Sequence, residues 1–266
     1  MGISARMNTS GFTHALFSKI STYLSPPAPY REATPPGSLY TLQMAYRQTS
    51  FAPDEYYHCY SRGIDKRITF QDSTDYERFL QALYVCNDTE SFNRDDLPRH
   101  SHASILSRQR TQPLVSVVAY CLMPNHYHII LHETAEGGIT RFMQKLGTMY
   151  TMYFNAKNDR IGGLFVKPFR AKHIANDRYL QRVISYIHLN PVEIFEPGWK
   201  EGRVKNMNVL KSNLLSYRYS SLPEYEHTHR PESAILHVPL VRSLSDGHLP
   251  ILSLINEAAE YYKGLR

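Results

Sequence analysis

The chain has 266 residues, of which 42% are hydrophobic and 20% are charged, and this composition is typical of a globular protein with one large or two small domains. Its three cysteines have no Cys-x-x-Cys spacing, which argues against a disulfide framework and against a thiolate zinc site. No apolar stretch approaches the roughly twenty residues of a membrane span, and no signal-peptide core is present, so we expect a cytoplasmic protein. The formal net charge of +6 favours a polyanionic partner.

Composition divides the chain into three parts. Residues 1–43 are rich in Ser, Thr, Pro and Gly, and we expect them to form a disordered N-terminal extension. Residues 44–226 carry the patterned sequence of a domain, within which the polar stretch 88–112 is predicted to be a long loop or insertion. Residues 227–266 are expected to be a C-terminal extension that contains a helix near 249–262.

Hydrophobic periodicity predicts a strand, a helix, two strands, a long helix, an extended segment and a final helix. These elements are expected at residues 56–63, 74–86, 114–120, 127–132, 139–154, 164–174 and 177–190. A capping box of Thr74 and Glu77 would begin the first helix, and Asn176 or Asp177 would cap the last one before Pro191 ends it. This order predicts an α+β fold in which helices cover an antiparallel sheet.

Two pairs of side chains point to a metal site. His126 and His128 lie in an apolar run, and residues two apart on a strand project from the same face. Tyr186 and Asn190 are four apart on the predicted helix and share a face there. Two imidazoles, a carboxamide oxygen and a phenol around one ion indicate metal-assisted phosphodiester chemistry, with Tyr186 as the nucleophile.

Each of these residues also has an ordinary structural interpretation. A His-x-His pair can lie on a solvated strand face, Tyr186 can pack on the sheet, and Asn190 can end its helix as a C-cap. The aliphatic surroundings of the histidines favour the metal site, because an unpaired polar ring is costly there. His132 shares the parity of the pair but is expected to support it or to be incidental, and His188 is expected to be structural.

Basic residues cluster between the long helix and the tyrosine helix, where aromatic residues interleave with them. This combination suits single-stranded DNA, whose bases stack while cations hold the phosphates. Two further cations follow the first strand. The predicted DNA-binding residues are Arg62, Lys66, Lys167, Arg170, Lys172, Arg178 and Arg182.

Two motifs together resemble one known family. Met123-Pro-Asn-His-Tyr-His-Ile-Ile-Leu131 resembles the HUH signature of single-tyrosine transposases, and Tyr186-Ile-His-Leu-Asn-Pro-Val192 resembles the tyrosine motif of the REP-associated tyrosine transposases in the IS200-like superfamily. Shorter motifs resemble the same family in order, and the resemblance covers about residues 50–226. The chain departs from the family pattern at Tyr127, where an aliphatic residue is usual, and at Glu193, where a basic residue is common.

The resemblance implies a ferredoxin-like HUH domain that nicks and transfers single-stranded DNA at hairpin-forming sites. It implies a 5′-phosphotyrosine intermediate on Tyr186, and Mg²⁺ or Mn²⁺ held by His126, His128 and Asn190. The implied protein is a monomer or a homodimer, and its tyrosine serves either its own chain or a partner's.

Two other functions fit parts of the pattern. The first is a domesticated protein that binds hairpin DNA without transposition activity, and the presence of His126, His128, Tyr186 and Asn190 argues against it. The second is a nucleotide hydrolase with a histidine-rich motif. That enzyme would need a third histidine where Ile130 stands.

Overall fold

A computed structural model describes residues 50–92, 100–201, 203–245 and 253–256, so the predictions for residues 1–43 and for most of the helix at 249–262 lie outside the described residues. Its centre is a four-stranded sheet in the order β2-β3-β1-β4, and each neighbouring pair is antiparallel. The strands are β1 (Tyr56–Arg62), β2 (Ser116–Met123), β3 (His126–His132) and β4 (Arg170–Ile174).

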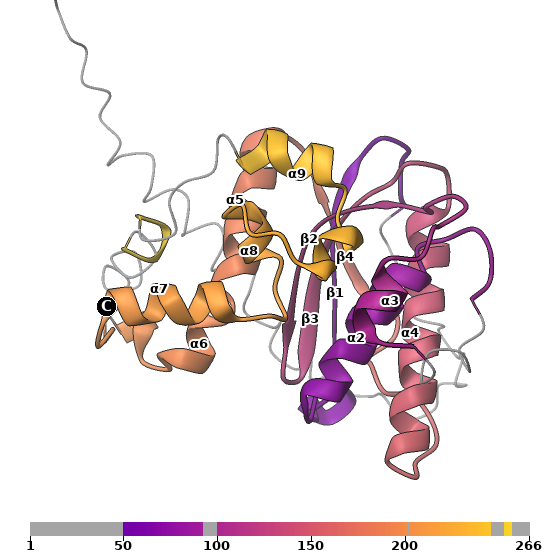
Figure 1. Cartoon of the computed structure of the whole chain (residues 1–266), viewed down its shortest axis with the longest axis horizontal. Helices are drawn as coiled ribbons and strands as arrows, with labels where there is room; N and C mark the ends of the chain where they lie inside the picture. The colour runs from indigo at the N-terminus through magenta and orange to yellow at the C-terminus, as the bar shows by residue number, and fades with distance from the viewer. Residues whose placement is uncertain (1–49, 93–99, 202, 246–252, 257–266) are drawn as a thin grey trace, which may run out of the picture.

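Helices cover both faces of this sheet, as Figure 1 shows. On one side lie α2, α3 and α4, and on the other lie α5 and α8. The helices on the first side are α2 (Ser73–Val85), α3 (His102–Leu106) and α4 (Gly138–Lys157). The remaining α-helices are α5 (Asp177–Leu189), α6 (Val192–Phe195), α7 (Met207–Ser216), α8 (Leu222–Tyr225) and α9 (Val238–Ser245), with short 3-10 turns at Ile64–Lys66, Trp199–Glu201 and Pro231–Ile235.

The connectivity confirms the predicted fold class. A helix follows β1, the hairpin β2-β3 comes next, and α4 leads to β4, so the chain order of the core is β-α-β-β-α-β. With β1 and β3 at the centre, this is the ferredoxin-like arrangement. Pro124 and Asn125 form the two-residue turn between β2 and β3.

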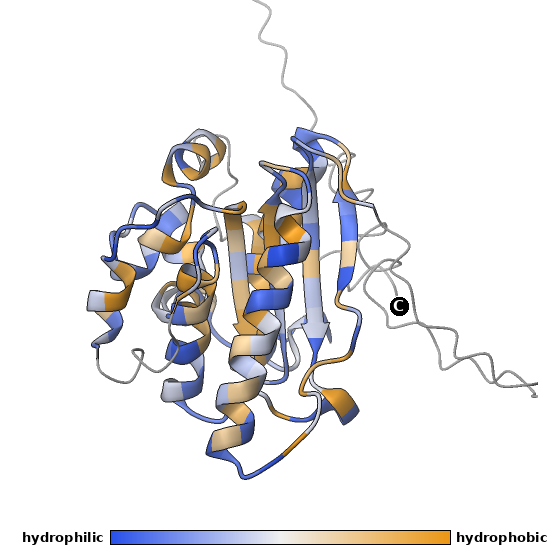
Figure 2. Cartoon of the chain, turned by 90° about the vertical axis from the view of Figure 1, so that its right-hand side faces the viewer, coloured by the Kyte–Doolittle hydropathy of each residue, from blue (hydrophilic) through white to orange (hydrophobic). Residues whose placement is uncertain are grey.

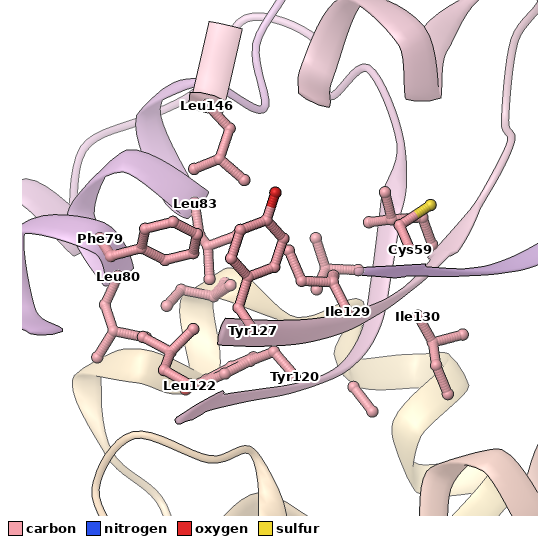
Figure 3. Close-up of a cluster of buried hydrophobic side chains, with 14 of the residues drawn as sticks. Cys59, Phe79, Leu80, Leu83, Tyr120, Leu122, Tyr127, Ile129, Ile130 and Leu146 are labelled. Carbon is pink, nitrogen blue, oxygen red and sulfur yellow. The ribbon is translucent and has the colours of Figure 1, made fainter. Parts of the chain in front are cut away.

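The alternation of side chains on β3 separates the core from the functional face. Tyr127, Ile129 and Leu131 point toward α2 and α4, and Figure 3 shows Tyr127 on the same side of the sheet as Phe79 and Leu146. The Tyr127 and Phe79 ring centroids are 5.0 Å apart. Tyr127 therefore fills the core and faces away from the neighbouring histidines, so its departure from the family pattern leaves their positions unaltered.

The start of α2 differs from its prediction. Asp72, and not Thr74, is the N-cap, and its side chain accepts a hydrogen bond from the Asp75 backbone N–H at 3.1 Å. The Asp75 carboxylate in turn accepts from the Gln71 N–H at 2.8 Å. Asp75 is fully buried, and its carboxylate thus completes the capping at the start of the helix. The helix therefore begins two residues earlier than the Thr-x-x-Glu spacing indicates.

The predicted loop at 88–112 contains the helix α3, which we did not predict. Ser101 caps it by accepting from the Ser104 N–H at 3.2 Å, and Ile105 and Leu106 are buried against the main core. A helix of five residues is too short to show a clear period in the sequence. Residues 93–99 of this stretch lie outside the described part of the chain.

The segment after α7 closes the outer edge of the sheet. The backbone N–H of Leu122 donates to the carbonyl of Tyr219 at 2.9 Å, and the N–H of His237 donates to the carbonyl of Val117 at 2.9 Å. Ile235 and Val241 then contribute to the same core as the sheet. Among the described residues, no helix is long and apolar enough to cross a membrane. The hydropathy colouring in Figure 2 shows hydrophilic and hydrophobic residues alternating along the helices.

Candidate active site

Two histidines of β3 face α5 from the sheet. His126 is half-buried at the start of the strand, and His128 is 6% exposed at its next outward-facing position. Their ring centroids are 5.1 Å apart and the ring planes are nearly perpendicular at 89°. The strand alternation that the sequence predicts therefore brings both imidazoles to one place, on the face opposite the α2–α4 core.

The helix α5 lies over these rings and contributes Tyr186 and Asn190. The Tyr186 ring is half-buried, and its centroid is 5.6 Å from that of His128 in an edge-on contact at 85°. Asn190 stands one turn later as the C-cap of the helix, and its side-chain amide donates to the Tyr186 carbonyl at 2.9 Å. The structure thus brings the four predicted site residues together within one chain.

The side chain of His126 is held from two directions. Its Nδ1 is 2.7 Å from the Asn125 Oδ1, and it also forms a hydrogen-bond interaction with the side chain of Asn190. Burial lowers the pKa of His126 to about 4, with a further lowering by the charge of Arg62, while the Asn190 interaction acts in the opposite sense. His126 is consequently a neutral imidazole at physiological pH.

His128 is neutral for similar reasons. Burial lowers the pKa of His128 well below its ordinary value, and the neighbouring His58, His126 and Arg62 lower it further. Neutral imidazole is the form that binds metal ions, so these surroundings keep both histidines in the state that coordination requires.

A third histidine at the site was missed by the sequence analysis. His58 lies on β1, is 5% exposed, and places its Nε2 2.8 Å from the Nδ1 of His128. Burial, followed by the charge of Lys172, lowers the pKa of His58 to about 3. The alternation of β1 puts His58 on a single face with Tyr60, but only the pairing of β1 with β3 shows that this face is the one with His128. The sequence does not show the register between β1 and β3, so it could not place His58 beside His128.

The donor atoms fit a divalent metal. Nδ1 of each candidate ligand has a neighbour, Asn125 for His126 and His58 for His128, which leaves the two Nε2 atoms for an ion. The amide nitrogen of Asn190 is engaged with the helix backbone, so its oxygen is the atom of that side chain that can meet His126 or bind an ion. No three His, Cys, Asp or Glu side chains gather as a metal site among the described residues. The fit therefore depends on a carboxamide oxygen as the third ligand.

The predicted cations divide into three groups by position. In the β1 pairing, Arg62 is opposite His126, Arg170 is opposite Tyr60, and Lys172 is opposite His58, so these three share the face of the histidines. Arg178 and Arg182 lie on α5, where burial and then the charge of the neighbouring Arg178 lower the pKa of Arg182.

Lys66 and Lys167 occupy connections near the end of the sheet. Lys66 lies in the turn after β1, where its carbonyl accepts from the Asn125 side chain at 3.2 Å. Lys167 is exposed between β4 and a short bridge from Phe165 to Gly63. Among the predicted cations, Arg62 is the one whose charge lowers the pKa values of both His126 and His128.

The two other histidines discussed in the sequence analysis, His132 and His188, lie outside this cluster. His132 bonds Asp54 at 3.0 Å and stacks on Tyr56, at the opposite end of β3 from His126. His188 is buried and bonds the Ser221 hydroxyl at 2.9 Å. Glu193, the second departure from the family pattern, forms an ion pair with Lys200 at 2.6 Å.

Comparison with known proteins agrees with the motifs. A family model described as "Transposase IS200 like" matches residues 81–190, a span that includes both histidines, Tyr186 and Asn190. The resemblance to the IS200-like transposases is confirmed over this span. The match spans less than half of the chain and supports a DNA-processing protein of the transposase type.

A solved structure of a REP-associated tyrosine transposase bound to a REP hairpin is also similar to this chain. The identity is 16% and the TM-score is 0.44, over 70% of this chain and 88% of that one. Among curated proteins, none matches the chain.

Proposed function

We propose that the protein is a metal-dependent endonuclease and strand transferase for single-stranded DNA, of the transposase type, that acts through a 5′-phosphotyrosine intermediate. The observation that carries this proposal is the contact of the Tyr186 ring with His128 in the same chain, at a centroid distance of 5.6 Å. The match of residues 81–190 to the IS200-like transposases supports it independently.

Tyr186 is the proposed nucleophile, and His126, His128 and Asn190 are the proposed ligands of Mg²⁺ or Mn²⁺. When bound, the ion polarises the scissile phosphate and neutralises charge that develops on its oxygens. Helix α5 carries both the nucleophile and one ligand, so it fixes the phenol relative to the phosphate site. That placement supplies the orientation on which an in-line attack depends.

The covalent step exchanges one ester for another. The Tyr186 oxygen attacks the phosphorus, a P–O bond to the phenol forms, and the bond from phosphorus to the 3′ oxygen breaks. The departing oxygen takes a proton and leaves as a free 3′ hydroxyl, while the phenol proton passes to solvent. Because no ester is hydrolysed, attack by a 3′ hydroxyl can reverse the step and join a new strand.

The DNA would approach across the face that bears Arg62, Arg170 and Lys172. The exposed Arg62 and Arg170 can hold phosphates, and the half-buried Tyr60 between them offers a ring for base stacking. We propose hairpin-bearing DNA as the substrate because of the family resemblance. Since all four site residues belong to one chain, we propose that a single copy is sufficient for nicking.

The direct test is a covalent-adduct assay with a hairpin-bearing single strand and Mn²⁺. The wild-type protein should form an adduct that migrates more slowly in a denaturing gel, and Tyr186→Phe should abolish it. Tyr60→Phe is the matched control, because the Tyr60 ring also lies 5.6 Å from His128, but on β1 and in a stacked orientation at 28°.

The two variants separate the possible outcomes. Loss of the adduct in Tyr186→Phe with retention in Tyr60→Phe supports the assigned nucleophile, and the reverse pattern contradicts it. Hairpin binding without an adduct under Mg²⁺ and Mn²⁺ would instead identify a domesticated DNA-binding protein.

A further inference from the structure

The inference concerns His58, a buried histidine to which neither the motifs nor the proposed chemistry assigns a role. It lies on β1 beside β3, and its Nε2 is 2.8 Å from the Nδ1 of His128. The two rings are close to parallel at 28°, with centroids 5.0 Å apart. The centroid of the His58 ring is also 6.2 Å from that of the Tyr186 ring, so His58 adjoins both the proposed ligand and the proposed nucleophile.

We infer that His58 is a positioning residue that accepts a hydrogen bond from His128 and thereby directs the Nε2 of His128 toward the metal. This inference rests on the proposed function, because it assumes that His128 is a ligand. A neutral imidazole that binds metal through Nε2 carries its proton on Nδ1. That proton needs an acceptor, and His58 Nε2 is the atom at hydrogen-bond distance.

The surroundings of His58 suit it to accept. The ring is 5% exposed, and Lys172 stands opposite it on β4, so a second proton on the ring would be both desolvated and repelled. With Nε2 occupied by the bond from His128, the single proton of His58 is on Nδ1. An imidazole thus occupies the place that a carboxylate or a backbone carbonyl usually has behind a metal-bound histidine.

A neutral acceptor suits this site because it adds no negative charge beside the cations. The adjacent Arg62 and Arg170 are exposed and placed to hold phosphate, and the buried Nζ of Lys172 adds positive charge to the same face. A carboxylate behind His128 would attract these cations and repel the DNA, whereas a neutral histidine orients the ligand and adds no negative charge. The choice of residue is therefore consistent with a polyanionic substrate.

The first experiment measures Mn²⁺ binding to the full-length protein by the loss of the free-ion electron paramagnetic resonance signal. His58→Phe keeps a ring of similar size but has no acceptor, and it should weaken Mn²⁺ binding by about 10- to 100-fold. His58→Gln is the matched variant, because its amide oxygen is the same number of bonds from Cα as Nε2. It should restore binding to within about threefold of the wild type.

The outcomes distinguish this inference from the proposed function. If His128→Ala weakens Mn²⁺ binding but His58→Phe does not, His58 has no positioning role and the proposed function stands. If neither His126→Ala nor His128→Ala changes Mn²⁺ binding, the metal site is wrong and the inference falls with it. Equal losses in His58→Gln and His58→Phe would also contradict a role as acceptor.

A second measurement needs no substitution and covers the case in which His58→Phe fails to fold. In wild-type protein with ¹⁵N-labelled histidine and bound Mg²⁺, the ring nitrogen spectra should show His128 protonated at Nδ1 and His58 unprotonated at Nε2. A proton on His58 Nε2 in the Mg²⁺-bound protein would overturn the inference.

Discussion

Burial is the main cause of the lowered pKa values of the histidines at this site. His58 and His128 are each at most 6% exposed, and no carboxylate is among the groups that shift their pKa values. Their pKa values fall for the same two reasons, desolvation and nearby positive charge. The result is a set of neutral imidazoles beside cations, an arrangement suited to a metal ion and phosphate together.

The nitrogen and the oxygen of the Asn190 side chain have different proposed roles, which substitutions can separate. Its amide N–H donates to the Tyr186 carbonyl, and its oxygen is the proposed metal ligand. Asn190→Ala removes both ends and should weaken Mn²⁺ binding by more than about tenfold. Asn190→Asp loses the amide donor but keeps an oxygen, so it should bind Mn²⁺ at least as tightly as the wild type. Titration of both variants against Mn²⁺ checks this, and equal weakening in the two would contradict the ligand assignment.

At the scale of elements, the sheet separates stability from chemistry. Helices α2 and α4 pack on one face, and the ends of these helices are joined by a buried acid. Asp75 is fully buried and accepts from the Tyr153 hydroxyl at 2.8 Å and from Lys157 at 2.7 Å. The other face is covered by α5, which carries Tyr186 and Asn190 over the histidines.

Lys157 of α4 contacts two carboxylates at the start of α2 at the same distance. It lies 2.7 Å from both Asp75 and Asp72, but the Asp75 side chain is fully buried while that of Asp72 is 52% exposed. Asp75→Ala should lower the free energy of unfolding by about 3 kcal/mol, because it strips partners from buried groups. Asp72→Ala should cost only about 1 kcal/mol, the value of a lost N-cap.

Urea unfolding of the two variants measures these costs. Because both residues lie away from the α5 face, Mn²⁺ binding by the folded variants should equal that of the wild type. A larger loss for Asp72→Ala than for Asp75→Ala would show that burial does not set the value of these ion pairs.

At the scale of the whole molecule, the net charge of +6 is less informative than the positions of the cations. Arg62, Arg170 and Lys172 stand on the face of the histidines, and Arg178 and Arg182 lie on the helix that covers it. A phosphate backbone that crosses this face would release counterions from several contacts at once.

The salt dependence of hairpin binding tests this distribution of charge. Arg170→Ala should lower the slope of log affinity against log salt concentration by about 1, since it removes one phosphate contact. Arg141→Ala is the matched control, because Arg141 is an exposed arginine on α4, on the opposite side of the sheet. It should leave the slope unchanged. Equal effects of the two would indicate binding without a preferred face.

The sequence by itself determined the four strands and the long helices α2, α4 and α5, together with the pairing of the proposed site residues. A two-residue period put His126 and His128 on one face, and a helical turn joined Tyr186 to Asn190, because these relations depend only on local backbone geometry. The short helix α3 and the true cap of α2 were not predictable in the same way, since they depend on what Ile105 and Asp75 meet in the core.

Tertiary structure alone decided how the two halves of the site meet. The antiparallel register of β1 with β3 brought His58 to His128, and the packing of α5 on the sheet brought Tyr186 over both rings in one chain. Contacts between residues so far apart in sequence depend on pairing and burial across the whole domain. Local patterns do not encode them, and for this reason the proposed ligands could be named from the sequence while His58 could not.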